Sequence, residues 1–359
     1  MRQSKQTSYL NGNIKAILSE LNIDGGFDIF KIHAGGNNRN YKLLTDDKNF
    51  CLKEYYWSSE DTRDRGKTEF EFLSALWNSG IRSISEPIHY DEYSHIGLFE
   101  FIEGNKIQTN DVNNDLVDRS LQFFKEINFN RYNNQNCNLL NASESCFTIS
   151  DHISMVNMRI ERLGTIDDST SINKDVQFYI NNKLLPLWDN IKKGIYEEAK
   201  KQFIGLNNLL PINERCLSPS DFGFHNAILD ENDELKFIDF EYAGWDDPAK
   251  FVGDYFCQPS VQINLEYFHE FSSSVAQLFP NPEMNLLRYQ MLLPLFQIKW
   301  CCIILNEFLP DAEKRRQFAN NNFSINRLKI DQLAKAESAL GRVALITKYL
   351  IGGMHHGIH

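Results

Sequence analysis

The order of hydrophobic and polar residues divides the chain into two parts. Between residues 27 and 56, short runs such as "FDIFKIHA" and "NFCLKEYY" carry β-branched and aromatic residues and are separated by turn clusters, which predicts strands. Two further strands are predicted within "SEPIHYDEY" and "HIGLFEFIEG". The spacing of apolar residues predicts helices over residues 8–24 and 62–79 in this first part.

After Gly104 the pattern becomes mostly helical. The predicted helices span about 110–130, 150–163, 173–204, 263–278, 283–307 and 325–351. Strand signals return only at "NAILD" and "LKFIDF". We therefore expect an α+β fold with two lobes: a small N-lobe with an antiparallel sheet over residues 1–103, and a larger, mostly helical C-lobe over residues 104–359.

Composition and charge narrow the class of protein. The chain has 359 residues, of which 42% are hydrophobic and 24% charged, as in ordinary globular proteins. Its net charge of -11 argues against binding nucleic acid through phosphate contacts. The seven cysteines form no C-x-x-C spacing, which favours a reducing cytoplasm. The most apolar segment, "LLRYQMLLPLFQIKWCCIILNEFL", is interrupted by Arg288 and Lys299, which predicts a buried helix and no membrane insertion.

The stretch "LSPSDFGFHNAILDENDELKFIDFEYAG", residues 217 to 244, carries the candidate chemistry. Asp221 and Asn226 are spaced as D-x-x-x-x-N, and Asp239 follows a second hydrophobic run. A hairpin would bring the two turns together. Phosphoryl transfer needs a carboxylate to orient the attacking hydroxyl and oxygen ligands to hold Mg²⁺. We therefore predict Asp221 as the catalytic residue and Asn226 with Asp239 as Mg²⁺ ligands; the alternative is two acids that cap loops in a hairpin.

Three further candidates lie upstream in the chain. Gly35 and Gly36 allow a sharp turn whose N–H groups could hold phosphate oxygens, although a plain hairpin turn would explain them equally well. Lys53 lies on the next predicted strand, and Glu69 on the following helix is its candidate partner. A solvated lysine and glutamate is the alternative. However, these candidates follow one another along the chain in the order found in kinases: the glycine turn, the lysine, the glutamate, the catalytic aspartate and the metal-binding aspartate.

Together these motifs resemble the aminoglycoside phosphotransferase and choline/ethanolamine kinase superfamily, small-molecule kinases with a protein-kinase-like fold, over nearly the whole chain. "GGNNRNYKL" is similar to the family's nucleotide loop, with Asn38 at its usual Asn, and "SDFGFHN" and "FIDFEYAGWDDPA" are similar to its catalytic loop and metal-binding segment. "GLFEFIEG" resembles its hinge. The resemblance implies that backbone groups of Glu100, Phe101 and Ile102 meet the adenine, and that ATP or GTP is the donor.

The chain also departs from the family pattern around the catalytic loop. The usual His-Gly-Asp is replaced by "PSD" at residues 219–221. Gly223 stands where a second His is usual, and His225 stands where Gly is more common. Phe251 replaces an Asp that usually braces the loop. We interpret these departures as a linked change of scaffolding, and His225 as a rival candidate for the base.

The combined prediction is a small-molecule kinase that transfers the γ-phosphate of ATP or GTP to a hydroxyl of a small acceptor. The alternative is a nucleotide-binding pseudokinase with a regulatory or scaffolding role. Choline, ethanolamine, an amino sugar, an aminoglycoside or a neutral sugar all stay open as acceptors. Trp300 beside carboxylates would suit an amine; we prefer the interpretation that Trp300 is core and that Asp246 and Asp247 cap a helix.

Overall fold

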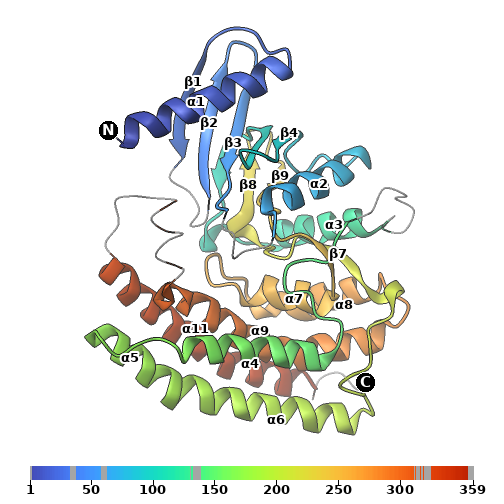
Figure 1. Ribbon diagram of the computed structural model, residues 1–359. Coiled ribbons are helices and arrows are strands. Elements are labelled where there is room, and N and C mark those ends of the chain that lie inside the picture. The colour runs from blue at the N-terminus through green and yellow to red at the C-terminus, as the bar shows by residue number, and fades with distance from the viewer. Residues whose placement is uncertain are drawn as a thin grey trace.

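The two lobes expected from the sequence are present in the computed structural model (Figure 1). It describes residues 2–32, 38–57, 63–129, 131, 139–310, 312, 316, 318 and 325–354. An antiparallel sheet of five strands forms most of the first part, and helices form most of the second. The predicted α+β class, with a small sheet-containing part and a larger helical part, is therefore confirmed.

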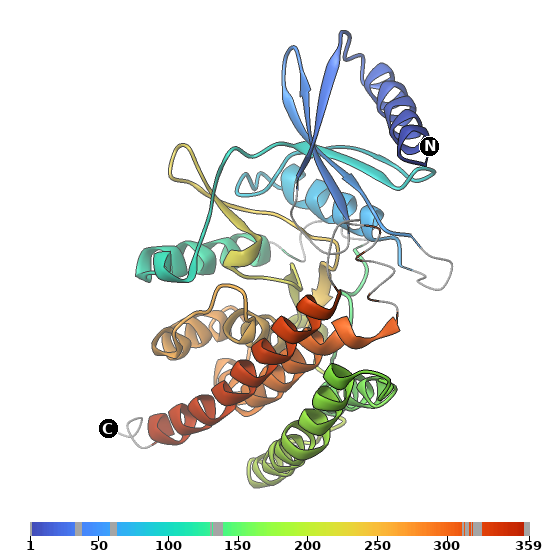
Figure 2. The ribbon, with the colours of Figure 1, turned by 90° about the vertical axis from the view of Figure 1, so that its left-hand side faces the viewer.

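The sheet of the N-lobe has the strand order β1-β2-β3-β5-β4, with every neighbouring pair antiparallel. Its strands are β1 (Phe27–Ile32), β2 (Arg39–Thr45), β3 (Asn49–Glu54), β4 (Pro87–Asp91) and β5 (Ile96–Glu100). Helix α1 (Arg2–Glu20) covers one face (Figure 2). There Ile14 and Ile17 of the helix join Leu43, Leu52 and Leu98 of the sheet in a core of their own.

Helix α2 (Arg65–Asn78) packs on the sheet from the side that faces the C-lobe. Its first turn is fixed by Asp64, whose side chain accepts a hydrogen bond from the backbone N–H of Lys67 at 2.9 Å. Its buried face includes Phe72, whose ring stacks on Phe240 with centroids 5.6 Å apart. These residues belong to one apolar core that continues into the C-lobe. The division into two domains at residue 103 therefore stays a prediction.

Short strands connect the sheet to the loops of the C-lobe. After β5 the chain forms β6 (Gly104–Lys106), which pairs with β8 (Ala227–Asp230), and β8 forms a hairpin with β9 (Leu235–Phe237). Gly104 has φ +157°, and a Cβ there would lie 2.3 Å from the carbonyl oxygen of Leu229, so only glycine fits. β7 (Cys216–Ser218) pairs with β10 (Gly244–Asp246). The β7–β10 pair thus holds both ends of the segment 219–243, within which β8 and β9 form their hairpin.

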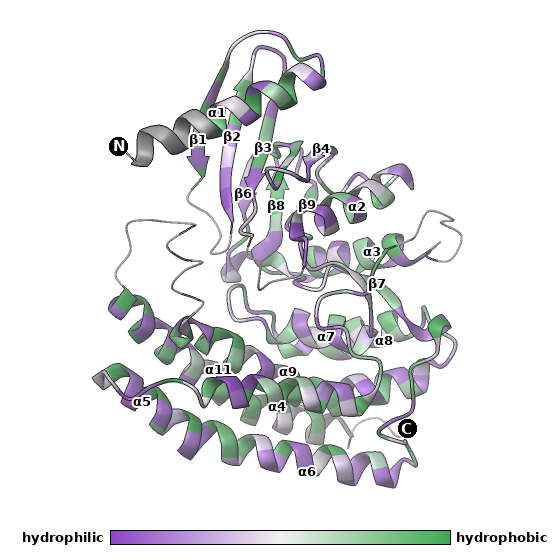
Figure 3. Cartoon of the chain, in the orientation of Figure 1, coloured by the Kyte–Doolittle hydropathy of each residue, from purple (hydrophilic) through white to green (hydrophobic). Residues whose placement is uncertain are grey.

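Helices lie beside and beneath these strands in the C-lobe, and those at its base carry both hydrophobic and hydrophilic residues (Figure 3). They are α3 (Asn114–Phe129), α4 (Ile149–Leu163), α5 (Ser171–Tyr179), α6 (Leu185–Lys201), α7 (Pro248–Cys257), α8 (Phe268–Ala276), α9 (Pro282–Leu305) and α11 (Ile325–Met354). The helix predicted over 173–204 is present as α5 and α6, which are joined without a break by a π turn at Ile180–Leu184. Helix α7 was not among the predicted helices, although Asp246 and Asp247 were expected to cap a helix at this point; all of its residues are buried.

Helix α9 is the buried helix that the sequence predicted. Among the described residues, Pro282–Phe308 is the only segment apolar and long enough to cross a membrane by length and composition, and 67% of its most apolar window is buried. It packs against α4, α6, α7, α8 and α11, which places it at the centre of the C-lobe. Its apolar character is therefore explained by burial within the fold.

Candidate active site

A buried lysine joins the two lobes. The Nζ of Lys53, on β3, donates to Glu69 Oε1 at 2.7 Å and to Asp239 Oδ1 at 3.2 Å. Glu69 is held from two more sides, by the hydroxyl of Tyr55 at 2.6 Å and the backbone N–H of Phe240 at 3.2 Å. Burial acts to lower the pKa of Lys53, but the charges of Asp239 and Glu69 outweigh it and raise the pKa well above its usual value. The lysine therefore carries a fixed positive charge.

The candidate catalytic loop lies beside this pair. The backbone N–H of Ile238 donates to the carbonyl of Asn226 at 2.9 Å, so the turn after β9 meets the turn before β8 as the hairpin predicts. The amide of Asn226 donates to the backbone carbonyl of Asp221 at 3.0 Å. His225 Nε2 lies 3.1 Å from Asp221 Oδ1. Burial acts to raise the pKa of Asp221, but His225, Lys299 and Asn226 together outweigh it, so this pKa is lowered and the carboxylate stays ionised near neutral pH.

Two departures from the family pattern are linked by sterics. A Cβ at Gly223 would lie 2.9 Å from His225 Nδ1, closer than real Cβ contacts come. A histidine at 225 in this rotamer therefore requires glycine at 223. In this arrangement the imidazole of His225 lies beside Asp221.

A third departure is compensated by a lysine that the sequence analysis missed. Lys250 Nζ donates to Ser220 Oγ at 2.9 Å and forms an ion pair with Asp246, and both charged side chains are buried. Phe251, in the usual place of an aspartate, packs its ring on Phe222 with centroids 4.9 Å apart. The loop is thus braced by a lysine and a ring stack. The only sequence signal was the Asp246-to-Lys250 spacing of four residues.

Two residues of the site have backbone conformations that L-amino acids rarely adopt. Ser220 has φ +68° and Asp239 has φ +70°. Each costs on the order of 1 kcal/mol relative to a relaxed backbone. Such positions persist where surrounding contacts hold them, here the Lys250 and Lys53 side chains.

The candidate metal ligands are few but suited to Mg²⁺. The Asp239 side chain is 37% exposed, and only its Oδ1 accepts a hydrogen bond from Lys53. The side-chain nitrogen of Asn226 donates to the backbone carbonyl of Asp221, which leaves its side-chain oxygen without this contact. Oxygens of both residues are therefore available. Within the described residues no cluster of three or more His, Cys, Asp or Glu side chains could hold a metal. A pair of protein oxygens fits an ion whose coordination is completed by nucleotide phosphates and water.

Glu241 is a buried acid of this site to which the sequence analysis gave no role. Its Oε2 accepts a hydrogen bond from Asn38 Nδ2 at 2.6 Å, and Asn38 Oδ1 accepts one from the N–H of Tyr56 at 3.4 Å. Burial and then the charge of Asp239 raise the pKa of Glu241 to about 7. Asn38 thus ties the nucleotide-loop strand to the Asp239 segment. Gly35 and Gly36, the other two loop candidates, lie outside the described residues.

The candidate hinge uses part of its backbone within the protein. The N–H of Glu100 donates to the carbonyl of Glu86 at 2.9 Å, and the N–H of Phe101 donates to that of Asn49 at 3.3 Å. Two of the three hinge N–H groups are therefore engaged. If an adenine contacts this segment, Ile102 is the residue whose N–H we expect it to use.

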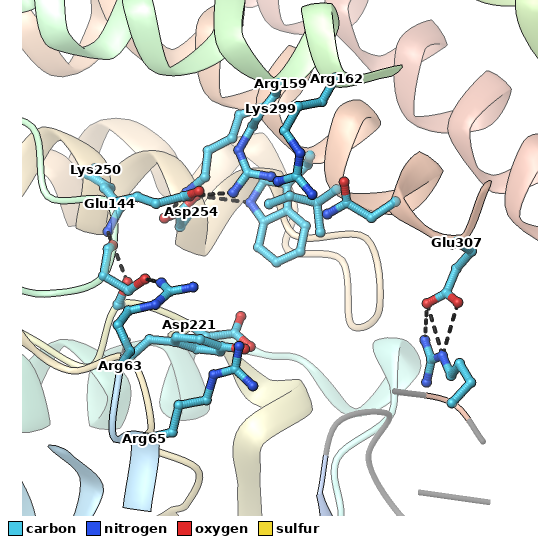
Figure 4. Close-up of a pocket in the computed structure, with 17 residues that line it drawn as sticks. Arg63, Arg65, Glu144, Arg159, Arg162, Asp221, Lys250, Asp254, Lys299 and Glu307 are labelled. Atoms are coloured by element: carbon cyan, nitrogen blue, oxygen red, sulfur yellow. Dashed lines mark hydrogen bonds and ion pairs between the residues drawn. The ribbon is translucent and has the colours of Figure 1, made fainter. Parts of the chain in front are cut away.

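A cavity of about 320 Å³ opens in front of Asp221 (Figure 4). Trp300 lines it and donates from Nε1 to Asp254 at 3.0 Å, so the interpretation of Trp300 as core is incomplete: the ring is only partly buried. Asp247 caps α7 as expected, accepting from the N–H of Ala249 at 2.8 Å, and Asp246 is occupied by Lys250. These two aspartates are therefore structural and do not line the cavity.

Comparisons with known proteins support the resemblance at the level of the fold. No protein-family model matches the chain. The chain is 22% identical over 283 residues to a probable ethanolamine kinase B of Dictyostelium discoideum, a match that covers 64% of this chain and only 60% of that relative.

Solved structures match over more of the length. The choline kinase LicA from Streptococcus pneumoniae is 15% identical, covers 93% of this chain and 99% of its own, and has a TM-score of 0.55. A spectinomycin phosphotransferase in complex with ADP and spectinomycin is 14% identical, with coverage of 85% and 92% and a TM-score of 0.54. An ethanolamine kinase of Plasmodium vivax is 15% identical, with coverage of 86% and 82% and a TM-score of 0.52. The chain therefore has the fold shared by aminoglycoside phosphotransferases and choline and ethanolamine kinases.

Proposed function

We propose that the protein is a small-molecule kinase that transfers the γ-phosphate of ATP or GTP to a hydroxyl group of a small acceptor. The observation that carries the proposal is the buried Lys53, held between Glu69 and Asp239 beside the ionised Asp221. These are the groups that phosphoryl transfer needs, in one place and on the fold of known small-molecule kinases.

Each side chain has a task in this reaction. Lys53, fixed by Glu69, would hold nucleotide phosphates by its charge. Asp221 would orient the acceptor hydroxyl and take its proton as the oxygen attacks the γ-phosphorus and the bond to ADP breaks. Asn226 and Asp239 would hold Mg²⁺, which when bound neutralises charge on the phosphates. The acceptor itself would enter through the cavity in front of Asp221.

Thermal unfolding with nucleotide tests the proposal. Mg²⁺–ATP or Mg²⁺–GTP at one hundred times its dissociation constant should stabilise the protein by about 2.7 kcal/mol. Lys53→Ala should lose most of this ligand-induced shift, whereas Lys67→Ala, which removes an exposed lysine of α2, should keep it. The shift is compared within each variant, because removing Lys53 also leaves Glu69 buried without its cation.

Two results would contradict the proposal in different ways. If no Mg²⁺–nucleotide stabilises the folded protein, nucleotide binding is wrong. If nucleotide binds but no hydroxyl compound in a broad panel promotes ATP or GTP consumption, the pseudokinase alternative replaces the kinase.

A further inference from the structure

The cavity in front of Asp221 is basic, although the chain as a whole is acidic. Seven basic side chains line it against four acidic ones, in a protein whose net charge is -11. Five of the seven are arginines: Arg63, Arg65, Arg159, Arg162 and Arg316. The lining of this cavity therefore has the opposite sign to the rest of the molecule.

The cavity is separate from the candidate nucleotide groups. Lys53, Asn226 and Asp239 are not among the residues that line it, whereas the catalytic candidate Asp221 is. Its walls include residues of α4, α7 and α9 of the C-lobe, the start of α2 and several loops. The positive charge consequently lies where an acceptor would sit and not where the phosphates of the donor would.

The carboxylates of the cavity are already bound by cations. Both oxygens of Asp254 accept from Lys299 at 2.7 Å. Glu144 is paired with Arg159. Glu307 accepts from the Nε of its arginine partner at 2.9 and 3.0 Å. Of the four acids, Asp221 alone has no lysine or arginine partner among the described residues, and it is the candidate for the acceptor hydroxyl.

One arginine remains available to a ligand. Arg162 is exposed in the last turn of α4 and forms no ion pair with any residue that the structure describes. It lies three residues after Arg159, so both guanidinium groups leave the same face of the helix. In Figure 4 Arg159, Arg162 and Lys299 enter the cavity from one side, and Asp221 faces them from the other. Neighbouring guanidinium groups suit the planar, bidentate recognition of a carboxylate or phosphate.

We propose that the acceptor is an alcohol that also carries an anionic group, a carboxylate or a phosphate, which binds Arg162 and Arg159 while its hydroxyl faces Asp221. This inference rests on the proposed kinase function and specifies the substrate class of that same site. A cationic acceptor such as an amino alcohol would meet an excess of positive charge in the cavity. The only lining carboxylate without a lysine or arginine partner among the described residues is that of Asp221, which the reaction itself needs. The arginines thus select against amines as well as for anions.

Binding of small matched probes tests this without knowledge of the natural acceptor. The full-length protein is saturated with Mg²⁺–ADP, so that the nucleotide site is filled, and titrated in thermal-shift assays with glycerate, glycerol 3-phosphate, glycerol and serinol. These probes share a hydroxylated three-carbon skeleton and differ in charge. We expect one or both anions to stabilise the protein at concentrations where glycerol and serinol do not. Whether glycerate or glycerol 3-phosphate binds more tightly distinguishes a carboxylate from a phosphate.

Variants assign the effect to the cavity. Arg162→Ala should weaken anion binding by roughly tenfold or more, as expected for the loss of a charge-assisted hydrogen bond, and Arg162→Lys should restore part of it. Lys193→Ala removes one positive charge from the exposed face of α6, which does not line the cavity, and should leave binding unchanged.

The possible results separate this inference from the kinase proposal. Failure of Mg²⁺–ADP and of Mg²⁺–GDP to stabilise the protein overturns the proposed function, and the four probes are then titrated without nucleotide; if only Mg²⁺–GDP stabilises it, Mg²⁺–GDP replaces Mg²⁺–ADP in the titrations. If nucleotide does stabilise the protein, three results would overturn only the anionic acceptor. Serinol could bind better than the anions, neither anion could have an effect, or Arg162→Ala could leave the anion affinity unchanged.

Discussion

Replacing Lys250 by Met tests whether a buried ion pair braces the catalytic loop. The side chains of Lys250 and Asp246 are 1% and 0% exposed, and Met removes the charge while keeping a chain of similar length. In the variant, the Asp246 carboxylate keeps one hydrogen-bond donor among the described residues, the backbone N–H of Asp247 at 2.9 Å. Removing one partner of a buried pair costs about 3–5 kcal/mol of the free energy of unfolding.

The cost should depend on pH with a definite sign. Burial already raises the pKa of Asp246 even though Lys250 opposes it, so the pKa rises further without the lysine. The folded pKa then exceeds the unfolded value of about 3.9. The destabilisation should therefore nearly vanish below about pH 4 and grow by about 1.4 kcal/mol per pH unit until the folded pKa is passed.

Urea unfolding at several pH values between about 5 and 8 measures the free energy of unfolding. It is carried out on the wild type, on Lys250→Met and on the double variant Lys250→Met/Asp246→Asn. The double variant should regain most of the stability, because no charge remains buried. It should not regain turnover, because Ser220 still lacks its donor from Lys250. A destabilisation that does not vary with pH, or a double variant with full turnover, would refute the reasoning.

The remaining predictions concern the catalytic groups and a second buried pair. Asp221→Asn should keep nucleotide binding and lose phosphoryl transfer by on the order of a hundredfold, more than His225→Ala does; a dead His225 variant beside an active Asp221 variant would reverse the roles. Asp239→Asn should lower turnover far more than the unfolding midpoint, and a nucleotide complex whose Mg²⁺ avoids this side chain would contradict it as a ligand. His152 is buried 3.0 Å from Asp247; burial alone would lower its pKa, but the interactions with Asp247 and Cys146 together outweigh burial and raise the pKa to about 9. Because this exceeds the unfolded value of about 6.5, stability should be lost as pH rises from about 6.5 to 9, and His152→Gln should flatten that part of the curve.

Features that depend on local spacing could be predicted from the sequence. The turn between β8 and β9 is short, so Asn226 and Asp239 had to lie near each other once the hairpin formed. The alternation of strands and helices likewise predicted Lys53 on a strand and Glu69 on the helix behind it, and their side chains meet at 2.7 Å. Such contacts follow from the geometry of neighbouring elements.

Features that depend on tertiary packing could not be predicted in this way. Lys250 lies 30 residues from Ser220, and a lysine in a short helix is usually solvated, so its burial was not foreseeable. Arg65 and Arg162 come from different lobes, and each alone is typical of an exposed helix end. Their common cavity exists only after the lobes pack. The charge of this cavity is consequently a property of the fold and not of any motif.

The attachment of α2 to the C-lobe has a consequence for regulation. In protein kinases the corresponding lysine–glutamate pair is made and broken as its helix moves, and this movement switches activity. Here Phe72 stacks on Phe240, and Glu69 accepts the N–H of Phe240 at 3.2 Å, so the helix shares the core of the lobe beneath it. Swinging it outward would open that core. We therefore expect an enzyme that is assembled at all times and has no on–off switch at this helix, with its rate in the cell following the supply of donor and acceptor.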